Sequence, residues 1–447
     1  MDDTEKYSLY LHWWFEFQLP EFIPRSYPQG LLRTRAIPVF TGPRRSGKST
    51  MLFQLIAELR QSEPAQNILY INFEDDRLAP LTGSELSDFL AVYRQQFPVA
   101  EDRPVYMLID EIQNLPGWEK TIRRMYDTEP EVKLLITGSN SKLLSRNIAT
   151  ALRGRTLSIP VFPLNFAEFL MFKQIPLPER SALPFSDRQK NRLLRAFQEY
   201  FTFGGFPEVV LEPQELFKEK LLREYFHTIF FADIIERHEI RSVKLMDAFI
   251  KMLTRQMACL FSMGKMQASL QSMGFKVSKT TLIDYFGYIE EAFLGTAVPI
   301  YSYSIKDRLQ YPRKFYLIDN GLFQIASFQK REDQGRLLEN LVFWHLQSRY
   351  EDIYYWKGGN GFEVDFVLPE LLEQDDLPAL IQVCFDMTDD RTRKRERRAL
   401  MKAASELGAK RALIITRDRW GEETLDNVQV TIRPFIDWAL QERPDFR

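Results

Sequence analysis

The sequence has little of what builds a disulfide framework, a zinc site or a membrane span. Its two cysteines, Cys259 and Cys384, are far apart and its four histidines are scattered, so neither a disulfide-rich fold nor a Cys/His zinc site is expected. No apolar run approaches membrane-spanning length, and the N-terminal MDDTEKYS is acidic where a signal peptide is basic. We therefore expect a cytoplasmic protein that does not enter a membrane.

An excess of charge of one sign is also missing. The formal net charge is −2, from 59 basic and 61 acidic residues, so the charge of the whole chain does not indicate nucleic-acid binding and only a local basic surface can. The hydrophobic fraction of 45% and the charged fraction of 27% are typical of globular proteins. A chain of 447 residues is too long for one core, so we expect roughly two to four domains.

One short motif carries much of the functional information. The stretch TGPRRSGKST at 41–50 follows the apolar run 36–40 and has the G-x-x-x-x-G-K-S spacing of a P-loop. In a P-loop, backbone N–H groups wrap the β-phosphate of a nucleotide and the next helix points its positive end at it. The expected strand at 36–41 and helix at 50–59 supply the required context. The residues predicted to bind ATP are Gly42, Pro43, Arg44, Arg45, Ser46, Gly47, Lys48, Ser49 and Thr50.

An acidic pair after a second apolar strand predicts the rest of this site. Asp110 and Glu111 follow the strand expected at 104–109, where a carboxylate lies at the sheet edge that binds ligands. We expect the Ser49 hydroxyl and Asp110 to hold Mg²⁺, and Glu111 to orient or deprotonate the attacking water. The alternative, an acid pair that caps a helix, loses weight downstream of a P-loop.

Further strands complete an α/β domain. A strand expected at 68–73 lies between the P-loop and the acidic strand along the chain, and others are expected at 133–137 and 156–161. Together with the Asp-Glu pair, the strand at 68–73 marks the ATPase branch that inserts a strand into the sheet and hydrolyses with a glutamate.

Several strings together carry a family resemblance. GPRRSGKST, LIDEIQ, TGSNSKLLS, LRGR, PLNFAEF and YFTFGGFPEVV resemble the large prokaryotic family of AAA-type ATP-binding proteins, also called archaeal-type ATPases, whose C-terminal domain has no assigned function. The resemblance runs from about residue 35 to the C-terminus. With the residue patterns, it divides the chain into an N-terminal arm (1–34), an AAA-type P-loop core (35–165), a helical lid (166–240), a winged helix-turn-helix (241–325) and a restriction-endonuclease-like domain (326–447).

The resemblance implies roles for four further residues. Ser139, or its neighbour Asn140, stands where such enzymes place a polar sensor of the γ-phosphate. Arg153 and Arg155 stand just before the last core strand, where an arginine finger reaches the site of a neighbouring subunit in a homo-oligomer. The alternative is an arginine paired with an acid of its own chain. Pro207 matches the Gly-x-Pro motif of a lid that packs on the adenine. The alternative is a proline that only marks a helix boundary, which gives the same sequence pattern.

A helix-turn-helix is predicted from residue 261 to 286. Gly274 closes the first helix, Ser278 caps the second, and strand-like runs at 295–303 and 314–318 would form a wing. The basic residues on these elements are Lys276, Lys279, Lys306, Arg308, Arg313 and Lys314. Lys276 and Lys279 are the candidates for contact with DNA phosphates, unless the module serves only for packing.

The order of elements after residue 331 is αβββαβ, the core order of the restriction-endonuclease-like fold. Such nucleases place one acid on the first helix, one on the second strand and an acid-x-lysine on the third. Glu339 and Asp365 match the first two positions, but Gln382 and Cys384 occupy the third. A neutral amide is a weak Mg²⁺ ligand and a thiol supplies no cation, so we expect this nuclease-like site to be degenerate.

The sequence thus predicts a Mg²⁺-dependent ATPase that works as a conformational machine on DNA, with a nuclease-like domain that does not cleave. Two alternatives stay open. One is a nucleotide-controlled switch or scaffold for protein partners, and the other is an ATP-dependent nuclease.

Overall fold

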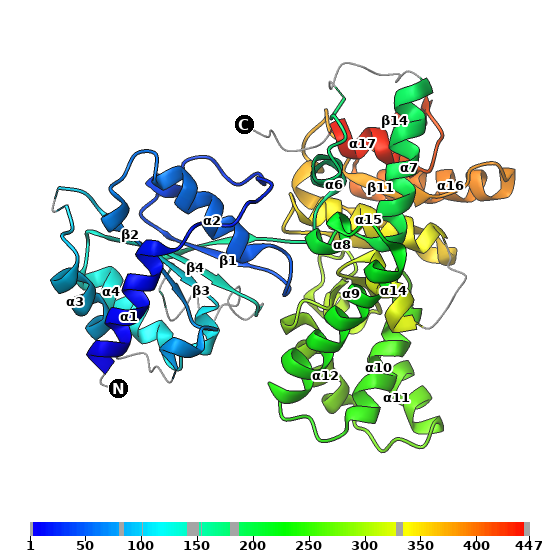
Figure 1. The fold of residues 1–447 in the computed structure, drawn as a ribbon. Helices are drawn as coiled ribbons and strands as arrows, with labels where there is room; N and C mark the ends of the chain where they lie inside the picture. The colour runs from blue at the N-terminus through cyan, green and yellow to red at the C-terminus, as the bar shows by residue number, and fades with distance from the viewer. Residues whose placement is uncertain are drawn as a thin grey trace. The chain divides into compact units, whose positions relative to one another are not determined.

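The computed structural model describes residues 3–79, 85–100, 102–140, 152, 154–178, 187–327 and 334–441. The chain divides into two compact units, the first mainly residues 1–162 and the second mainly residues 163–444 (Figure 1). Each unit has its own sheets and its own cluster of buried apolar side chains. Within the described ranges, no helix is long and apolar enough to cross a bilayer.

A five-stranded parallel sheet forms the centre of the first unit. Its order is β2-β3-β4-β1-β5, and all five predicted strands are present. The four strands other than β5 are almost entirely buried, as expected for a parallel sheet covered on both faces. The strands are β1 (Ile37–Thr41), β2 (Ile68–Asn72), β3 (Val105–Asp110), β4 (Val132–Gly138) and β5 (Thr156–Pro160).

The inserted strand of this sheet is β4, not the segment expected from the sequence. β4 lies between β1 and β3, whereas β2, which corresponds to the expected strand at 68–73, lies at the edge. Chain order misled the prediction because crossover connections let strands that are distant in sequence become neighbours in a parallel sheet. The outcome for the site is unaffected, since β1 and β3 still end at the same edge of the sheet.

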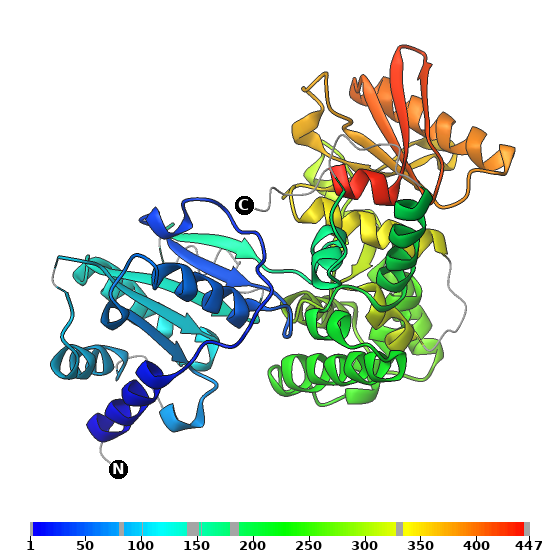
Figure 2. The same ribbon diagram turned by 45° about the horizontal axis from the view of Figure 1, so that its top comes forward.

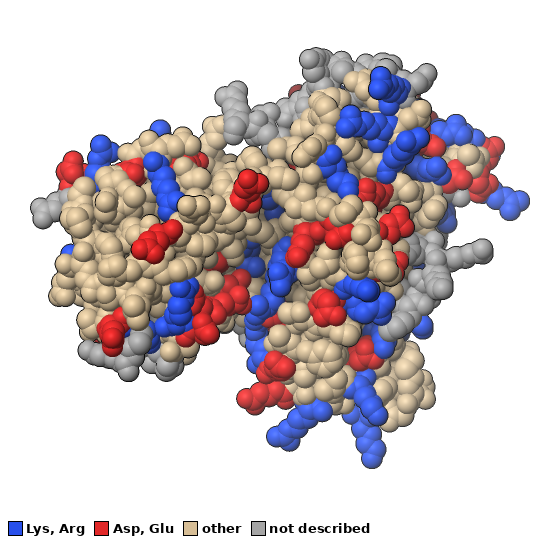
Figure 3. Space-filling view, viewed as in Figure 1, with Lys and Arg blue, Asp and Glu red and all other residues tan. Residues whose placement is uncertain are grey.

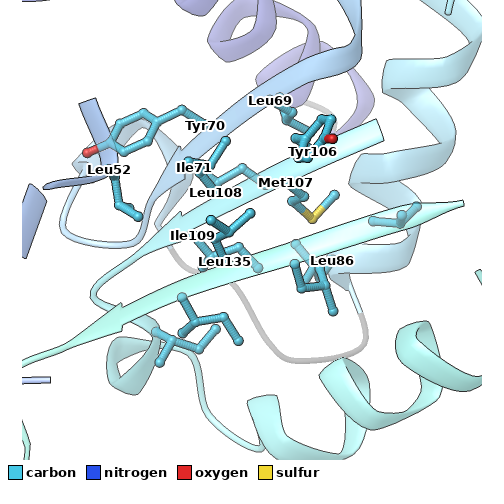
Figure 4. Close-up of a cluster of buried hydrophobic side chains, with 14 of the residues drawn as sticks. Leu52, Leu69, Tyr70, Ile71, Leu86, Tyr106, Met107, Leu108, Ile109 and Leu135 are labelled. Carbon is cyan, nitrogen blue, oxygen red and sulfur yellow. The ribbon is translucent and has the colours of Figure 1, made fainter. Parts of the chain in front are cut away.

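The core of this unit joins helices to the sheet. Figure 4 shows Leu52 and Leu86 among buried side chains of β2, β3 and β4, such as Ile71, Leu108 and Leu135. Both leucines come from helices, and both are at most 2% exposed. The helices of the unit after the arm are α2 (Lys48–Leu59), α3 (Glu85–Gln96) and α4 (Trp118–Thr128).

The N-terminal arm packs against the edge of the first sheet. Its helix α1 (Asp3–Glu16) buries Tyr7, Tyr10, Leu11 and Trp14, which follow the i, i+3, i+4, i+7 spacing of one helix face. The Asn72 N–H donates to Tyr10 Oη at 3.0 Å, and Trp14 Nε1 donates to the Ile68 carbonyl oxygen at 2.9 Å. Side chains of α1 therefore satisfy backbone groups at both ends of β2.

The second unit begins with a helical region. The loop that contains Gly204 and Gly205 is held by Asp319. The Asp319 carboxylate accepts hydrogen bonds from the N–H of Gly205 at 2.7 Å and from the N–H of Gly321 at 2.8 Å. Gly204 has a φ of +76°, and a Cβ there would lie 1.6 Å from Asp319 Oδ1, so only glycine is accommodated. The helices are α6 (Phe166–Phe172), α7 (Asp187–Phe203), α8 (Pro207–Leu211), α9 (Glu215–Thr228), a π-helical segment (Ile229–Glu236) and α10 (Val243–Arg255).

Helices and strands occupy the segments predicted to form a helix-turn-helix and its wing, and the winged helix itself stays a prediction. Gly274 has a φ of +89° after α11, and Ser278 Oγ accepts the Thr281 N–H at 3.0 Å as the cap of α12. Strand β8 pairs antiparallel with both β6 and β7. The elements are β6 (Leu260–Phe261), α11 (Met263–Ser272), α12 (Lys279–Glu291), β7 (Gly295–Val298), α13 (Ile305–Gln310), β8 (Arg313–Leu317) and α14 (Asn320–Ser327).

A six-stranded mixed sheet ends the second unit, in the order β13-β14-β12-β11-β10-β9. The predicted αβββαβ order is present, and a further hairpin and helix extend it. Helix α16 packs along one face of the sheet (Figure 2). The elements are α15 (Gln334–Gln347), β9 (Tyr354–Lys357), β10 (Glu363–Val367), β11 (Leu380–Cys384), α16 (Asp390–Leu407), β12 (Arg411–Thr416), β13 (Gly421–Leu425), β14 (Val428–Pro434) and α17 (Phe435–Gln441).

Candidate functional site

The loop at 42–47 has the strand, turn and helix that a phosphate-binding loop requires. It runs from the end of β1 to the first residue of α2, and both Arg45 (φ 66°) and Gly47 (φ 97°) adopt the left-handed conformation. A Cβ on Gly42 would lie 2.1 Å from the Val161 carbonyl oxygen, so this position requires glycine. Ser49 and Thr50 lie in the first turn of α2, whose N-terminus faces the loop.

Lys48 and Glu111 form a buried ion pair beside this loop. Lys48 Nζ lies 3.4 Å from Glu111 Oε1 and donates a hydrogen bond to the Pro43 carbonyl oxygen at 3.1 Å. Burial alone would raise the pKa of Glu111, but the Lys48 charge and a hydrogen bond from Gln113 outweigh it, and the pKa lies below its ordinary value. Glu111 is therefore ionised at neutral pH and able to accept a hydrogen bond or a proton.

Asp110 ends β3 beside the start of α2. Tyr70 Oη donates to Asp110 Oδ2 at 2.8 Å, and the Thr137 hydroxyl donates to Oδ1. Burial raises the pKa of Asp110, while hydrogen bonds from the hydroxyls of Ser49 and Thr137 act against that rise. The contact between Ser49 and Asp110 brings together the two residues predicted to hold Mg²⁺.

These residues fit a Mg²⁺ ion that is bound mainly through a nucleotide. Across the described parts of the chain, no three His, Cys, Asp or Glu side chains gather into a metal site. Mg²⁺ in nucleotide sites is held by one or two protein oxygens together with phosphate oxygens and water. Ser49 and Asp110 supply that number of oxygens, so a resident metal cage is not required here.

Ser139 lies next to Glu111. It is 1% exposed and accepts a hydrogen bond at 3.1 Å from Gln113 Nε2, which also donates to the Glu111 carboxylate. The Glu111 backbone N–H donates to Thr137 Oγ1 at 2.9 Å. The carboxyl ends of β3 and β4 therefore meet at one polar cluster, as expected from the parallel sheet.

Arg25 is a contributor that the sequence did not reveal. Its guanidinium donates to the Ser46 carbonyl oxygen at 2.8 Å and to the Phe162 carbonyl oxygen at 3.1 Å. Its backbone exchanges hydrogen bonds with the Gln54 side chain on α2. Arg25 thus supports the loop from behind, and because it lies in irregular chain with no motif, no local signal identifies it.

The two predicted arginine-finger residues have different outcomes. Arg153 lies outside the described residues. Arg155 donates to Asp127 Oδ1 at 2.7 Å, and its guanidinium lies 5.3 Å from the centre of the Tyr126 ring. The chain therefore contains the same-chain ion pair that was the alternative to a finger, and the finger stays a prediction.

Pro207 and the DNA-contact candidates lie in the second unit. Pro207 is the first residue of α8, the position where proline costs no hydrogen bond. Lys276, in the turn before α12, and Lys279, the first residue of α12, are exposed. Figure 3 shows basic side chains projecting from the end of the unit that α11 and α12 form, with acidic side chains beside them, and a similar mixture over α16.

The three residues predicted to form a degenerate nuclease-like site, Glu339, Asp365 and Gln382, lie close together in the second unit. Gln382 Oε1 accepts the Asp365 N–H at 3.2 Å, and Lys314 Nζ lies within 3.1 Å of oxygens of both Glu339 and Asp365. Lys314, one of the basic residues on the predicted wing, is not available for phosphate contact, because its side chain is buried among carboxylates. From sequence alone, a lysine in a short strand is expected to be exposed, because the carboxylates that pair with it here come from distant parts of the chain.

Comparisons with known proteins agree with the geometry of the first unit. A family model described as an AAA domain matches residues 34–170, and two described as domains of unknown function (DUF8612 and DUF4143) match 194–333 and 334–433. Uncharacterized protein MJ1544 of Methanocaldococcus jannaschii is 36% identical over 415 residues, which cover 90% of this chain and 88% of that protein. An uncharacterized protein of Haemophilus influenzae is 30% identical over 423 residues, which cover 93% and 98%.

A solved structure is also similar. The Walker-type ATPase PABY2304 of Pyrococcus abyssi is 14% identical, over 67% of this chain and 93% of that one, with a TM-score of 0.45.

Proposed function

Since the chain belongs to the family of the Methanocaldococcus jannaschii protein MJ1544 and carries an AAA domain, we propose that it binds and hydrolyses ATP to drive a conformational change. The observation that carries the proposal is the polar cluster at the end of the first sheet. Lys48, Ser49, Asp110, Glu111 and Ser139 meet beside the loop at 42–47, although they come from three separate segments of the chain. This arrangement matches the needs of phosphoryl transfer to water.

Each residue of the cluster has a distinct role in this proposal. The loop N–H groups and Lys48 bind the phosphates, and Ser49 with Asp110 holds the Mg²⁺ that neutralises charge on them. Glu111, kept ionised by Lys48, accepts a hydrogen bond or a proton from the attacking water. Ser139, oriented by Gln113, senses the γ-phosphate.

We propose DNA as the partner of this machine. The support is local: exposed Lys276 and Lys279 flank the start of α12 in a helix-turn-helix followed by two antiparallel strands. ATPase rates measured with and without single-stranded, duplex and branched DNA test this. Stimulation by DNA supports the proposal, and rates that no DNA changes favour the switch or scaffold for protein partners.

The C-terminal domain is proposed to bind without cleaving. Gln382 and Cys384 lack the charges that the third strand of an active nuclease supplies. The protein is incubated with supercoiled plasmid and Mg²⁺ or Mn²⁺, and no nicking is expected. Nicking that disappears in Asp365→Ala would overturn this part of the proposal and favour the ATP-dependent nuclease.

Assembly into a homo-oligomer, with Arg155 completing the neighbouring site, is the last part of the proposal. A finger in trans makes specific activity rise with protein concentration, and mixing Lys48→Ala with Arg155→Ala protein would restore some turnover. Specific activity that is constant from nanomolar to micromolar protein, with no rescue on mixing, would instead leave Arg155 as the partner of Asp127.

A further inference from the structure

Lys314 stands at the centre of an acidic cluster in the second unit. Its Nζ atom lies 2.7 Å from Asp365 Oδ1, 2.7 Å from Glu363 Oε1 and 3.1 Å from Glu339 Oε1. The carboxylates come from α15 and β10, whereas Lys314 comes from β8, a strand of the three-stranded sheet. One ammonium group therefore joins two sheets and a helix.

The oxygens of this cluster are already engaged by the chain. Tyr316 Oη donates to Glu339 Oε1 at 2.7 Å, and the Val383 N–H donates to Asp365 Oδ2 at 2.9 Å. The Gln382 side-chain oxygen accepts a hydrogen bond from the Asp365 N–H. Each oxygen that a divalent cation would use at Asp365 and Gln382 thus accepts a hydrogen bond from the protein itself.

Most of the cluster is buried, and its third carboxylate, Glu363, is partly exposed, with 29% of its side chain open to solvent. Lys314 is 1% exposed, Asp365 5%, Gln382 6% and Glu339 8%. Burial favours a neutral amine, but the charges of Asp365 and Glu339 outweigh it and raise the pKa of Lys314 well above its ordinary value. The lysine is therefore a permanent cation that neutralises Asp365 and Glu339 in the buried part of the cluster, which meets solvent at Glu363.

We propose that the Lys314 ammonium is the resident cation of this carboxylate site, where it takes the place of a divalent metal and fastens β8 to the six-stranded sheet. The site is complete without metal, and the residues do not fit a Mg²⁺ ion while Lys314 is present. The proposal does not depend on ATP hydrolysis, so failure of the ATPase assays would leave it intact. The competing interpretation is a catalytic lysine that has moved to another strand, which requires a metal bound by the same acids.

Metal binding separates the two interpretations. Free Mn²⁺ is measured by electron paramagnetic resonance in nucleotide-free full-length protein, with Mn²⁺ up to about 1 mM, where weak protein sites fill. Wild type and Asp365→Asn are expected to bind equal amounts. Lys314→Ala removes the ammonium group from the cation position and is expected to bind one Mn²⁺ per chain more than wild type. The double variant Lys314→Ala with Asp365→Asn is expected to bind no more Mn²⁺ than wild type. An Mn²⁺ bound by wild type and lost in Asp365→Asn, or no gain in Lys314→Ala, would overturn the proposal.

Thermal unfolding supplies a second test that needs no metal. Lys314→Met keeps the length of the side chain but leaves the carboxylates unpaired, so its Tm should fall by on the order of 10 °C. Adding Glu339→Gln and Asp365→Asn removes the uncompensated charge and should recover at least half of that loss. If Lys314→Met does not fold, folding of the triple variant gives the same answer. A triple variant as unstable as Lys314→Met alone would contradict the role of Lys314 as a counter-cation.

Discussion

Replacing Glu111 with glutamine should separate ATP binding from ATP hydrolysis. In the structure, Lys48 pairs with Glu111, so the lysine has to leave this carboxylate when it turns to a phosphate. At their separation of 3.4 Å, two unit charges attract by about 5 kcal/mol at an effective dielectric constant near 20. The phosphates replace most of this attraction; if about a fifth is not replaced, Glu111→Gln binds ATP about fivefold more tightly than wild type.

Turnover should respond in the opposite direction. Glutamine cannot accept the proton of the attacking water, and loss of a general base costs about 10²–10⁴-fold in rate. Lys48→Ala differs, because Lys48 contacts phosphate in both the ground state and the transition state, so ATP binding itself should weaken. The predicted pattern is therefore an ATP-binding but inactive Glu111→Gln, and a Lys48→Ala that binds poorly.

The assay combines equilibrium titration of a fluorescent ATP analogue with single-turnover hydrolysis. The matched control is Glu129→Gln, which neutralises a carboxylate paired with Arg94 at a partly exposed position. Near-normal turnover in Glu111→Gln would remove Glu111 from the mechanism. If the Kd of Glu111→Gln for ATP were at least tenfold higher than that of wild type, the idea that Lys48 exchanges the Glu111 carboxylate for a phosphate would be refuted.

Three further predictions follow from other sites. Arg25→Ala removes the charged donor to the Ser46 carbonyl and should weaken binding of the same ATP analogue about tenfold; an unchanged Kd would show that the loop holds its shape alone. Lys276→Ala with Lys279→Ala should lower the slope of log K against log salt for DNA binding by about one unit per lost contact, and an unchanged slope would favour a packing module. Burial raises the pKa of Asp319 to about 7, so the folded chain holds this proton more tightly than the unfolded chain, and stability from this group falls as pH rises from about 4 to 7. Asp319→Asn should flatten that dependence in denaturant unfolding, and a slope equal to that of wild type would exclude Asp319 as its source.

The first unit was the more predictable part from sequence. Gly42, Lys48 and Asp110 could be found because phosphate chemistry fixes a loop spacing and places the acid at the end of a buried strand. The strand order was harder to predict, because no local sequence pattern indicates that β4 rather than β2 lies beside β1.

Long-range contacts account for what the sequence did not reveal. Arg25 meets Ser46 across irregular chain, and Lys314 meets Asp365 from another sheet. A buried lysine is recognisable only through the carboxylates that neutralise it, and these come from elements that follow it in the chain. The sequence did identify Glu339, Asp365 and Gln382 as neighbours, because the order of elements after residue 331 specified the relative places of α15, β10 and β11.

The packing of α1 has a practical consequence for where this protein can be cut. The AAA family model begins at residue 34, so a chain trimmed to that boundary loses the helix whose Tyr10 and Trp14 bond to β2. The Asn72 N–H and the Ile68 carbonyl would then be unpaired at the rim of an apolar parallel sheet, the kind of surface that recruits strands from other molecules. Such a truncated protein would be prone to aggregate even with every nucleotide-binding residue intact. The boundary drawn by sequence similarity is therefore narrower than the boundary of the folding unit.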